Sequence, residues 1–548
     1  WPVCGLSWWL LGGSAFVRGA AYPQIHRVLD AAEVVNMRVS MLSMLHEVNP
    51  LGMQHVATYL EEQGHDVEVY WQPKEEDLTQ SELTQIVDRV VAHDPKLVGF
   101  ALMTIHFHRA KQLTEMIRAR LPEAKIIWGG IHPTLSPEEC IDVADIVCRG
   151  DGEDVTLQYC NTVDRGEDPT SIPSLWFRMP DGSVKKNEIQ NLPDDLDKYP
   201  FPKFNWDKSW MLWKGGVQRL TAELYAESVP RRGQIYDIMI TRGCPLVCTY
   251  CCNASFIKLY QGKGKILRSR STENVMEELK WVRKNYPFVG MFNIQDDIFL
   301  VRTKDNWIGE FASAYKKNVD LPFACKSTPN YVSEEVIAPL AEAGLQHMQM
   351  GIEGSDRVNW EVYKRRVSHE EFIQASEILW RHNVAGRYDI ILDDPYSNDA
   401  DTLQILDTLT KIRRPYWLQC FSLTFFPNTP IYDMGERDGL LNNGKDGYST
   451  QYGHVNPTYL NRLVIYSQRL PNKGVKFFIK HKDKKWAPAL LEAAITGYCE
   501  PMQRLISKIA AYPRLMVAVK TVYFNTMRVV ARHSKPKKEW MQIDLAGV

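Results

Sequence analysis

Two long stretches of this sequence alternate between short apolar runs and amphipathic segments, and this alternation restricts the possible folds more than any other feature. In the first stretch, residues 37–165, runs such as MRVSMLSML, KLVGFALM and AKIIWGG are separated by segments whose apolar residues recur about every 3.6 positions. Five strands separated by helices predict a parallel, doubly wound, Rossmann-like α/β sheet with right-handed crossovers. Ligands of such sheets bind beyond the carboxyl ends of the strands.

The second stretch, residues 234–426, contains six further strand candidates with helices between them. They are IYDIMIT, MFNIQ, PFACKS, HMQMGI, RYDIIL and WLQCFSLTF. Six β/α units predict a partial TIM-like barrel, whose chemistry takes place on the loops after the strands. The polar segments RGCPLVCTYCC, DDIF, TPN, EGSD and DDPYSN each follow a strand, so we expect the functional site at this end of the barrel.

These patterns divide the chain into five parts. They are an N-terminal extension that need not be native (1–36), a first α/β domain (37–165), a linker rich in Pro, Asp and Trp (166–230), the barrel (231–435) and a basic helical C-terminal region (436–548). The extension is apolar for too short a run to span a bilayer and lacks the basic start of a secretory signal. An arm that contacts a membrane is the alternative interpretation of the extension.

The charge of the chain is balanced overall but uneven along its length. A net charge of -1 over 548 residues argues against binding to nucleic acid along the whole chain. Residues 471–548, however, carry 15 Lys and Arg against 5 Asp and Glu. We interpret this C-terminal segment as surface helices packed on the barrel. The alternative is peripheral contact with an anionic membrane or an anionic substrate.

Three of the eleven cysteines, Cys244, Cys248 and Cys251, form a CxxxCxxC pattern in the loop after the first barrel strand. An odd number of cysteines with no extracellular spacing predicts a reducing compartment, which we take to be the cytoplasm. Zinc sites usually use four ligands, but this loop contains no histidine, and Cys252 follows Cys251 directly, so its side chain should point elsewhere. Three thiolates fit a 4Fe–4S cluster with one iron open to a small molecule.

Cys244-x-x-x-Cys248-x-Tyr250-Cys251 resembles the signature of the radical S-adenosylmethionine (SAM) superfamily, whose open iron binds SAM and whose cluster cleaves it to a 5′-deoxyadenosyl radical. The resemblance extends to GIEGSD, where Gly354 replaces the usual Ser, and to the segment FFPNTPIYDMGERDG, where Asn428 replaces Gly. It implies the following SAM-binding candidates: Tyr250, Asp296, Asp297, Lys326 and Glu353. Asp296 and Asp297 stand where many relatives carry Gly-Gly-Glu, and Lys326 is the weaker candidate for the SAM carboxylate.

Residues 37–165 resemble the cobalamin-binding domain that precedes such barrels in one radical SAM class, through segments such as IIWGGIHPTLSPEE and DIVCRGDGE. The resemblance implies the following corrin contacts: Thr104, Gly129, Gly130, His132 and Gly150. Many cobalamin proteins carry Asp-x-His-x-x-Gly after the first strand, but this chain has MLSMLHEVNPLG there. His46 therefore lacks the paired spacing, and we expect cobalamin to bind without a protein histidine on cobalt.

Together these resemblances imply a cobalamin-dependent radical SAM enzyme that methylates an unactivated carbon or phosphorus centre. Ring closure, ring contraction or rearrangement without methyl transfer remains the alternative, and a redox or vitamin-sensing binding protein is a rival from another class. We expect a small-molecule substrate that is large and apolar or anionic, and an external electron donor such as flavodoxin or ferredoxin. No catalytic acid or base is assigned, although Asp393, Asp394, Tyr396 and Cys325 are weak candidates for substrate contact.

Overall fold

The computed structural model describes residues 36–45, 51–73, 77–228, 235–441, 447–448, 453–501 and 504. The residues from His26 to Pro488 belong to one compact unit, which contains two large sheets. The second unit includes residues from Ala489 onward, where the described residues continue helix α17 (Ala487–Ala494) into the turn Ile495–Cys499. The predictions for residues 1–35, His46 and residues 505–548 lie outside the described residues.

The first sheet has five parallel strands at its centre, in the spatial order β5-β4-β3-β1-β2. They are β1 (Arg38–Ser43), β2 (Asp66–Trp71), β3 (Leu97–Ala101), β4 (Lys125–Gly129) and β5 (Ile146–Cys148). These strands are buried along almost their whole length, as expected for a parallel sheet covered on both faces. The order reverses between β1 and β3, which places the ligand crevice of a doubly wound fold at their carboxyl ends.

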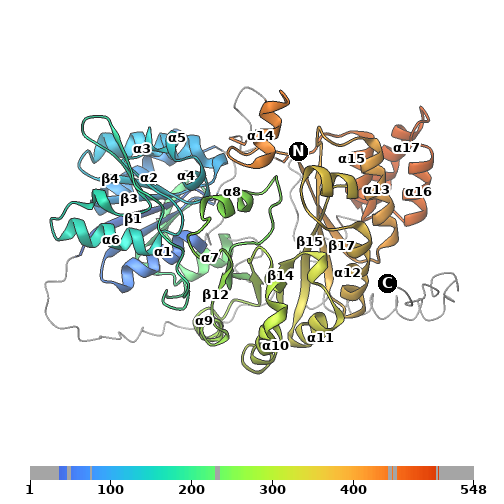
Figure 1. The fold of residues 1–548 in the computed structure, drawn as a ribbon, viewed down its shortest axis with the longest axis horizontal. Coiled ribbons are helices and arrows are strands. Elements are labelled where there is room, and N and C mark those ends of the chain that lie inside the picture. The colour runs from blue at the N-terminus through green and yellow to red at the C-terminus, as the bar shows by residue number, and fades with distance from the viewer. Residues whose placement is uncertain are drawn as a thin grey trace. The chain divides into compact units, whose positions relative to one another are not determined.

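Helices cover both faces of this sheet (Figure 1). They are α1 (Leu51–Glu62), α2 (Gln80–His93), α3 (Phe107–Arg120), α4 (Ile131–Leu135), α5 (Pro137–Ile141) and α6 (Glu153–Asp164). Helix α1 packs beside α6, and α2 packs beside α3. The start of α2 is fixed by a capping box, in which Thr79 and Glu82 each satisfy a backbone N–H of the other.

The segment 166–230, which we predicted to be a linker, adds four short strands to the two edges of the first sheet. They are β6 (Leu175–Arg178), β7 (Val184–Lys186), β8 (Ser209–Trp213) and β9 (Gly216–Arg219). Strand β6 pairs antiparallel with β5, and β8 pairs parallel with β2. These strands cover edges that would otherwise expose unpaired backbone groups, and the short helix α7 (Ala222–Ser228) follows them.

The second sheet has six parallel strands in sequence order and forms the predicted partial barrel. They are β10 (Ile235–Ile238), β13 (Met291–Ile294), β14 (Phe323–Ser327), β15 (Leu345–Glu353), β16 (Ala385–Leu392) and β17 (Tyr416–Ser422). Each of these six strands overlaps a strand candidate of the sequence. The two-domain α/β fold predicted from the alternation is therefore confirmed.

Helices connect the barrel strands and continue beyond the last one (Figure 1). The connecting helices are α8 (Cys252–Leu259), α9 (Thr272–Asn285), α10 (Trp307–Asn318), α11 (Glu334–Ala343), α12 (His369–Arg381) and α13 (Asp399–Lys411). After β17 come α14 (Pro430–Arg437), α15 (Tyr459–Ser467) and α16 (Asn472–Lys480), and the last two pack against α13. None of the helices in the described ranges combines the length and apolar character needed to cross a bilayer.

Candidate functional site

The three-cysteine loop follows β10 and the two-residue strand β11 (Thr241–Arg242), which pairs antiparallel with β12 (Arg268–Ser269). Gly243 opens the loop with a φ of 90°, and a Cβ atom there would lie 2.2 Å from the carbonyl oxygen of Ile266. Only glycine fits this position without backbone strain. The chain then turns at Cys248, whose carbonyl accepts the Cys251 N–H at 3.0 Å, and Cys251 precedes the first turn of α8.

The cysteine side chains lie in a largely buried environment. Cys244 and Cys248 are buried, and Cys251 is half-buried. Burial raises the pKa of Cys244 to about 12, whereas a hydrogen bond with the Cys252 thiol lowers the pKa of Cys251. Cys252 therefore contacts Cys251, although we expected its side chain to point elsewhere. Across the described ranges, no group of three or more His, Cys, Asp or Glu side chains is arranged to hold a metal ion.

Asp296 and Asp297 follow β13 but occupy different environments. The Asp296 side chain is buried, and its Oδ1 accepts the Ile240 N–H at 2.7 Å. Burial raises the pKa of Asp296 to about 6. Asp297 is exposed and accepts a hydrogen bond from Asn253 Nδ2 at 3.1 Å, and the same amide lies 3.6 Å from the Cys251 sulfur. Asp296 thus holds the strand end that leads into the cysteine loop, while Asp297 and Asn253 border the sulfurs.

Glu353 ends β15 and meets the cysteine loop through Arg365. Arg365 Nη2 donates to the Gly351 carbonyl at 3.0 Å, Nη1 lies 3.8 Å from Glu353 Oε1, and Nη1 also donates to Tyr250 Oη at 3.5 Å. Burial raises the pKa of Glu353 to about 7, and the Arg365 charge acts in the opposite direction. The Glu353 carboxylate lies over Gly351, where an added Cβ atom would be only 1.9 Å from Glu353 Oε1. A larger residue at position 351 would therefore displace the carboxylate.

Arg365 is a site residue that the sequence did not reveal. It is buried, whereas its neighbour Arg366 is exposed, and nothing in the sequence distinguishes the two. Its Nε has no hydrogen-bond partner among the described residues. A buried guanidinium N–H without a partner costs free energy, so this group is suited to bind a ligand.

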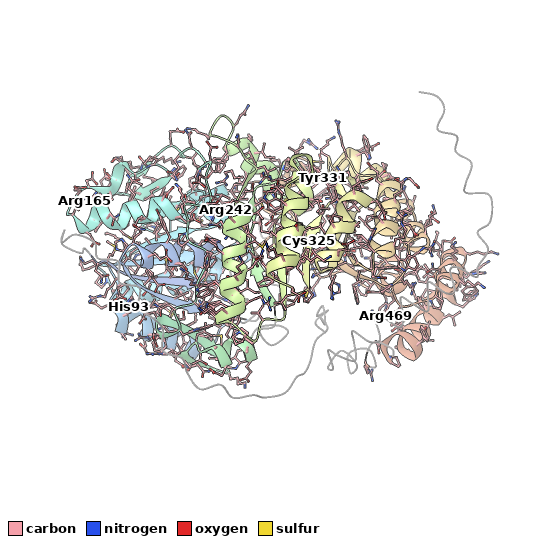
Figure 2. All side chains as sticks on the ribbon, turned by 90° about the horizontal axis from the view of Figure 1, so that it is seen from below. His93, Arg165, Arg242, Cys325, Tyr331 and Arg469 are labelled. Atoms are coloured by element: carbon pink, nitrogen blue, oxygen red, sulfur yellow. The ribbon has the colours of Figure 1, made fainter. Side chains whose placement is uncertain are left out.

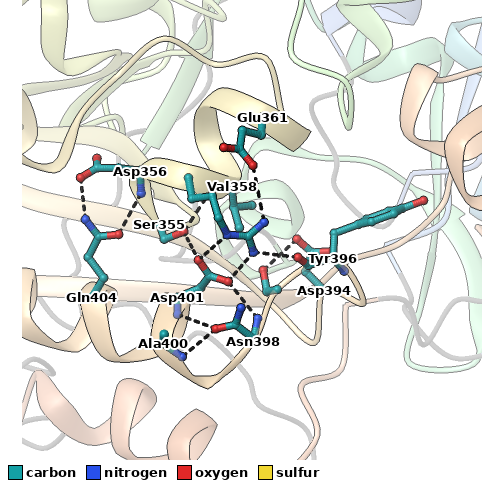
Figure 3. A network of polar contacts seen from close by, with 12 residues as sticks. Ser355, Asp356, Val358, Glu361, Asp394, Tyr396, Asn398, Ala400, Asp401 and Gln404 are labelled. Carbon is teal, nitrogen blue, oxygen red and sulfur yellow. Dashed lines mark hydrogen bonds and ion pairs between the residues drawn. The ribbon is translucent and has the colours of Figure 1, made fainter.

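A polar network fixes the turn that follows Glu353 (Figure 3). Ser355 and Arg357 both hydrogen-bond to the Asp401 carboxylate at the start of α13. Gly354 fits tightly there, because an added Cβ would lie 2.8 Å from Val358 Cγ1. The network anchors the end of β15 to the start of α13 and thereby orients Glu353.

The weak substrate candidates on the neighbouring loops make contacts within the protein. Asp393 accepts the Asn456 N–H at 2.7 Å, and buried Asp394 accepts the Tyr363 hydroxyl at 2.9 Å. Tyr396 donates to Asp438 at 2.9 Å. These contacts hold the neighbouring loops together.

The interior of the barrel is polar. Lys326 is half-buried on β14, whereas the adjacent Cys325 is buried on the opposite face of the strand. Gln349 donates to Asp389 Oδ2 at 2.6 Å, and burial raises the pKa of Asp389 against the opposing charges of Arg387 and Lys326. Asp389 Oδ1 and Gln419 Oε1 have no partner among the described residues. Buried polar atoms without partners favour a polar ligand in this interior.

At the edge of the first sheet, Thr104 and His132 contact each other. Thr104 Oγ1 lies 3.1 Å from His132 Nδ1, and the His132 ring packs edge-on against Phe107 and Tyr448. Burial lowers the pKa of His132 to about 4, so the ring is neutral at physiological pH. His132 Nε2 lies 3.4 Å from Glu139 Oε1. The histidine is therefore held on its Nδ1 side by Thr104, whereas its buried Nε2 has no hydrogen-bond partner among the described residues.

The glycines at the strand ends differ in what surrounds them. An added Cβ at Gly130, which has a φ of 104°, would lie 2.8 Å from the Leu102 carbonyl oxygen. At Gly150 it would lie 1.7 Å from the Tyr260 hydroxyl, which belongs to the residue after α8. At Gly129 it would meet only Cys148, at 3.7 Å. Gly130 and Gly150 make room for protein atoms, and only Gly129 leaves backbone open for a ligand.

Ion pairs join the base of the cysteine loop to the exit of β5. Arg242 lies 2.6 Å from Glu153 and 3.3 Å from Asp151, and Arg268 lies 2.7 Å from Asp151. Figure 2 shows Arg242 where the blue-green ribbon of the first domain meets the green ribbon of the barrel. Both arginine side chains are largely buried, at 14% and 5% exposed. These pairs fix the cysteine loop to the carboxyl edge of the first sheet.

Two residues after β17 also contact the first domain. Asn428 Nδ2 donates to Ser136 Oγ at 2.8 Å, and Tyr448 donates to the Glu139 carboxylate at 2.8 Å. Asn428, which stands where relatives of the barrel carry Gly, adopts a φ of 60°. Asparagine tolerates this conformation better than most residues, and its side chain gains a contact that glycine lacks.

Two protein families match this chain in succession. The B12 binding domain matches residues 37–158, and the Radical SAM superfamily matches residues 238–409. The first range contains the parallel strands of the first sheet, and the second begins in β10 and ends within α13.

Individual known proteins are similar at low identity. The anaerobic magnesium-protoporphyrin IX monomethyl ester cyclase of Rubrivivax gelatinosus is 21% identical over 71% of this chain and 66% of the cyclase. The cytidylyl-2-hydroxyethylphosphonate methyltransferase of Streptomyces wedmorensis is 26% identical over 59% of this chain and 64% of that protein. The chain thus spans about two thirds of the length of these relatives.

The fold also resembles a solved structure. The radical SAM methyltransferase TsrM of Kitasatospora setae, solved with cobalamin and a 4Fe–4S cluster bound, matches with a TM-score of 0.58. The match covers 73% of this chain and 78% of TsrM at 16% identity. At this identity the similarity establishes the shared fold.

Proposed function

This chain belongs to the cobalamin-dependent radical SAM enzymes, and on that premise we propose that it methylates an unactivated carbon or phosphorus centre of a small molecule. The observation that supports this most is the joining of the two domains: buried arginines at the base of the cysteine loop pair with acids at the carboxyl edge of the B12-binding sheet. A methyl carrier and a radical source must act on the same substrate, so their sites must be held close together.

The cofactors supply the difficult chemistry, and the protein supplies binding and orientation. When bound, the 4Fe–4S cluster supplies the electron that cleaves SAM to a 5′-deoxyadenosyl radical, and cobalamin carries the methyl group that the substrate receives. Cys244, Cys248 and Cys251 would hold the cluster. Their donor chemistry fits, because soft thiolates are the ligands of iron–sulfur clusters and three of them leave one iron for SAM.

The chain's polar groups would orient SAM beside the cysteines. Arg365 has a buried Nε without a partner, and Glu353 is held next to it at the barrel mouth. With a pKa of about 7, the Glu353 carboxyl can donate a hydrogen bond when protonated and only accept one when ionised, and it changes between these forms near neutral pH. We assign Arg365 and Glu353 to SAM, with Tyr250 orienting Arg365, and we retain Asp297 and Lys326 as further contacts. Asp296 Oδ1 holds the loop through the Ile240 N–H, and we retain its buried Oδ2, which has no hydrogen-bond partner among the described residues, as a further SAM contact.

On the corrin side, the chain offers mostly backbone. Gly129 has open space around its Cα, which fits the close approach of a flat macrocycle. His132 is buried, neutral and held by Thr104, so we propose that it supports the edge and does not ligate cobalt. We propose that Thr104, Gly130 and Gly150 shape the same edge.

The partners follow from the chemistry. Radical SAM enzymes act on small molecules and require an external electron donor, and we propose flavodoxin or ferredoxin for that role. We propose the cytoplasm as the location, because a reducing compartment preserves thiolate-bound clusters. We also propose peripheral membrane contact through residues 471–548, which the next subsection develops. A second candidate function, ring formation without methyl transfer, is favoured by the similarity to cyclases such as those of Rubrivivax gelatinosus and Synechocystis.

Labelled SAM separates the two candidates. Protein reconstituted anaerobically with iron, sulfide and cobalamin would be incubated with reductant, candidate substrates and SAM carrying a trideuterated methyl group. Methyl transfer predicts a product that has gained one labelled methyl group, together with 5′-deoxyadenosine. A product without label, in the presence of 5′-deoxyadenosine, would replace the methyltransferase proposal with the cyclase alternative.

A further inference from the structure

Helix α16 and the turn after it form an exposed face with an unusual composition. One side of α16 is buried, where Val475 and Phe478 lie and the helix packs against α13 and α15 (Figure 1). The opposite side exposes Lys473, Lys476 and Phe477. The outward side of an amphipathic helix is normally polar, but here it presents an aromatic ring among lysines.

Three rings gather on this outward side. Phe477, His481 and Trp486 have ring centroids 4.5 to 5.9 Å apart, and Phe477 and Trp486 are 41% and 44% exposed. We call Phe477, His481 and Trp486 the aromatic cluster. Single exposed apolar residues are common on protein surfaces, but a group of rings in mutual contact marks an interaction site.

The charge around the aromatic cluster has one sign. Residues 472–486 contain six lysines and one acid, Asp483, which pairs with Lys482 at 2.9 Å. None of the other five lysines pairs with a carboxylate in the described part of the chain, and all five lie close to the three rings in the sequence. These five lysines are Lys473, Lys476, Lys480, Lys484 and Lys485. Unpaired exposed lysines around aromatic rings complement a negatively charged, partly apolar surface.

We propose that the aromatic cluster and the five lysines dock on the surface of an anionic phospholipid bilayer. Phe and Trp side chains partition into the headgroup region, where a ring can be buried while its polar edge stays hydrated. Lysines near an anionic surface each strengthen binding by about fivefold. This proposal deepens the peripheral membrane contact proposed above and rests on it, but it does not depend on the radical chemistry.

Vesicle sedimentation tests the proposal with the full-length, cofactor-loaded protein. We expect binding to vesicles of phosphatidylcholine and phosphatidylserine, weak binding to phosphatidylcholine alone, and a loss of binding as salt is raised. The double substitutions Phe477→Ser with Trp486→Ser and Lys476→Gln with Lys480→Gln should each weaken binding at least about tenfold.

Matched controls lie elsewhere on the surface. Trp360→Ser removes a tryptophan that is 51% exposed, and Lys316→Gln with Lys317→Gln removes two exposed lysines at the end of α10. These controls should bind vesicles like the unmodified protein. The proposal would be overturned if all variants bound vesicles equally or if the unmodified protein did not bind them. It would also be overturned if the protein bound an acidic protein or RNA more tightly than the vesicles. Methyl transfer measured without vesicles reports on the proposed function separately.

Discussion

The two ligand-binding edges of the molecule use their polar groups in different ways. At the barrel mouth, Arg365 and Asp389 have buried polar atoms without a partner among the described residues, and Glu353 is half-buried beside Arg365. At the edge of the B12-binding sheet, Thr104 hydrogen-bonds to His132 Nδ1 and only His132 Nε2 of this pair lacks a hydrogen-bond partner among the described residues, while the space beside Gly130 and Gly150 is filled by protein atoms.

The barrel mouth thus offers several buried polar atoms to a ligand, whereas Gly130 and Gly150 at the other edge make room for protein atoms. Substitutions at the barrel mouth should impair cofactor binding more than stability, because the affected atoms lack protein partners. Substitutions among the packed residues of the first sheet should impair stability more than binding. Gly129, whose backbone is open, should be the exception on that side.

The largest effect is expected in the cysteine loop. Replacing Cys244, Cys248 or Cys251 with Ser should abolish the visible absorbance of the reconstituted cluster and reduce 5′-deoxyadenosine formation by about 10⁴-fold or more, because the removed thiolate is a metal ligand. Cys252→Ser is the matched control and should keep both. If Cys252→Ser also lost the cluster, the choice of the three ligands would be wrong.

The next effect concerns Arg365. Arg365→Gln should weaken SAM binding about ten- to hundredfold, because hydrogen bonds to charged groups contribute about 1.5–3 kcal/mol. Isothermal titration of the cluster-loaded protein with SAM measures the change. Arg366→Gln, at the exposed neighbour, should bind SAM normally. Equal SAM affinities for the two variants would contradict the claim that Arg365 at the barrel mouth binds SAM.

Two adjacent glycines test the same comparison on the other sheet. Gly130→Ala should destabilise the fold by about 1–3 kcal/mol, because it combines a positive φ with a Cβ contact at 2.8 Å. Gly129→Ala should change stability by less than about 1 kcal/mol but weaken cobalamin binding. Thermal unfolding and cobalamin titration of both variants measure the two effects. Normal cobalamin affinity in Gly129→Ala would remove the proposed corrin contact.

The smallest effect is a pH dependence of stability at His132. Its pKa is about 4 in the fold and about 6.5 when unfolded, so the unfolded chain binds more protons and stability is lost as pH falls through this window. Between pH 7.5 and pH 5 the loss from this residue should be about 2 kcal/mol. His132→Gln should remove this contribution to the pH dependence of the unfolding free energy, as measured by urea unfolding at both pH values. An identical pH dependence in the variant would show that His132 is not buried in its neutral form.

The sequence predicted the strands of the first sheet well where apolar runs were long, as in KLVGFALM, because burial on both faces leaves a strong pattern. It also predicted the six barrel strands, although residues of strands such as β14 alternate between buried and half-buried. It did not predict strands β6 to β9, which are short and depend on pairing with the existing sheet edge. Arg365 was missed because its role depends on contact with Tyr250, 115 residues earlier, and its neighbour is also arginine. The sequence also could not distinguish Gly129 from Gly130, since only the packing around each Cα does so.

Electron paramagnetic resonance of the reduced, cluster-loaded protein tests most directly whether one iron is left free for SAM by Cys244, Cys248 and Cys251. A 4Fe–4S signal should appear, and adding SAM should shift its g-values in the unmodified protein and in Cys252→Ser alike. A protein that takes up zinc instead of iron, or a cluster signal that does not respond to SAM, would contradict the assignment.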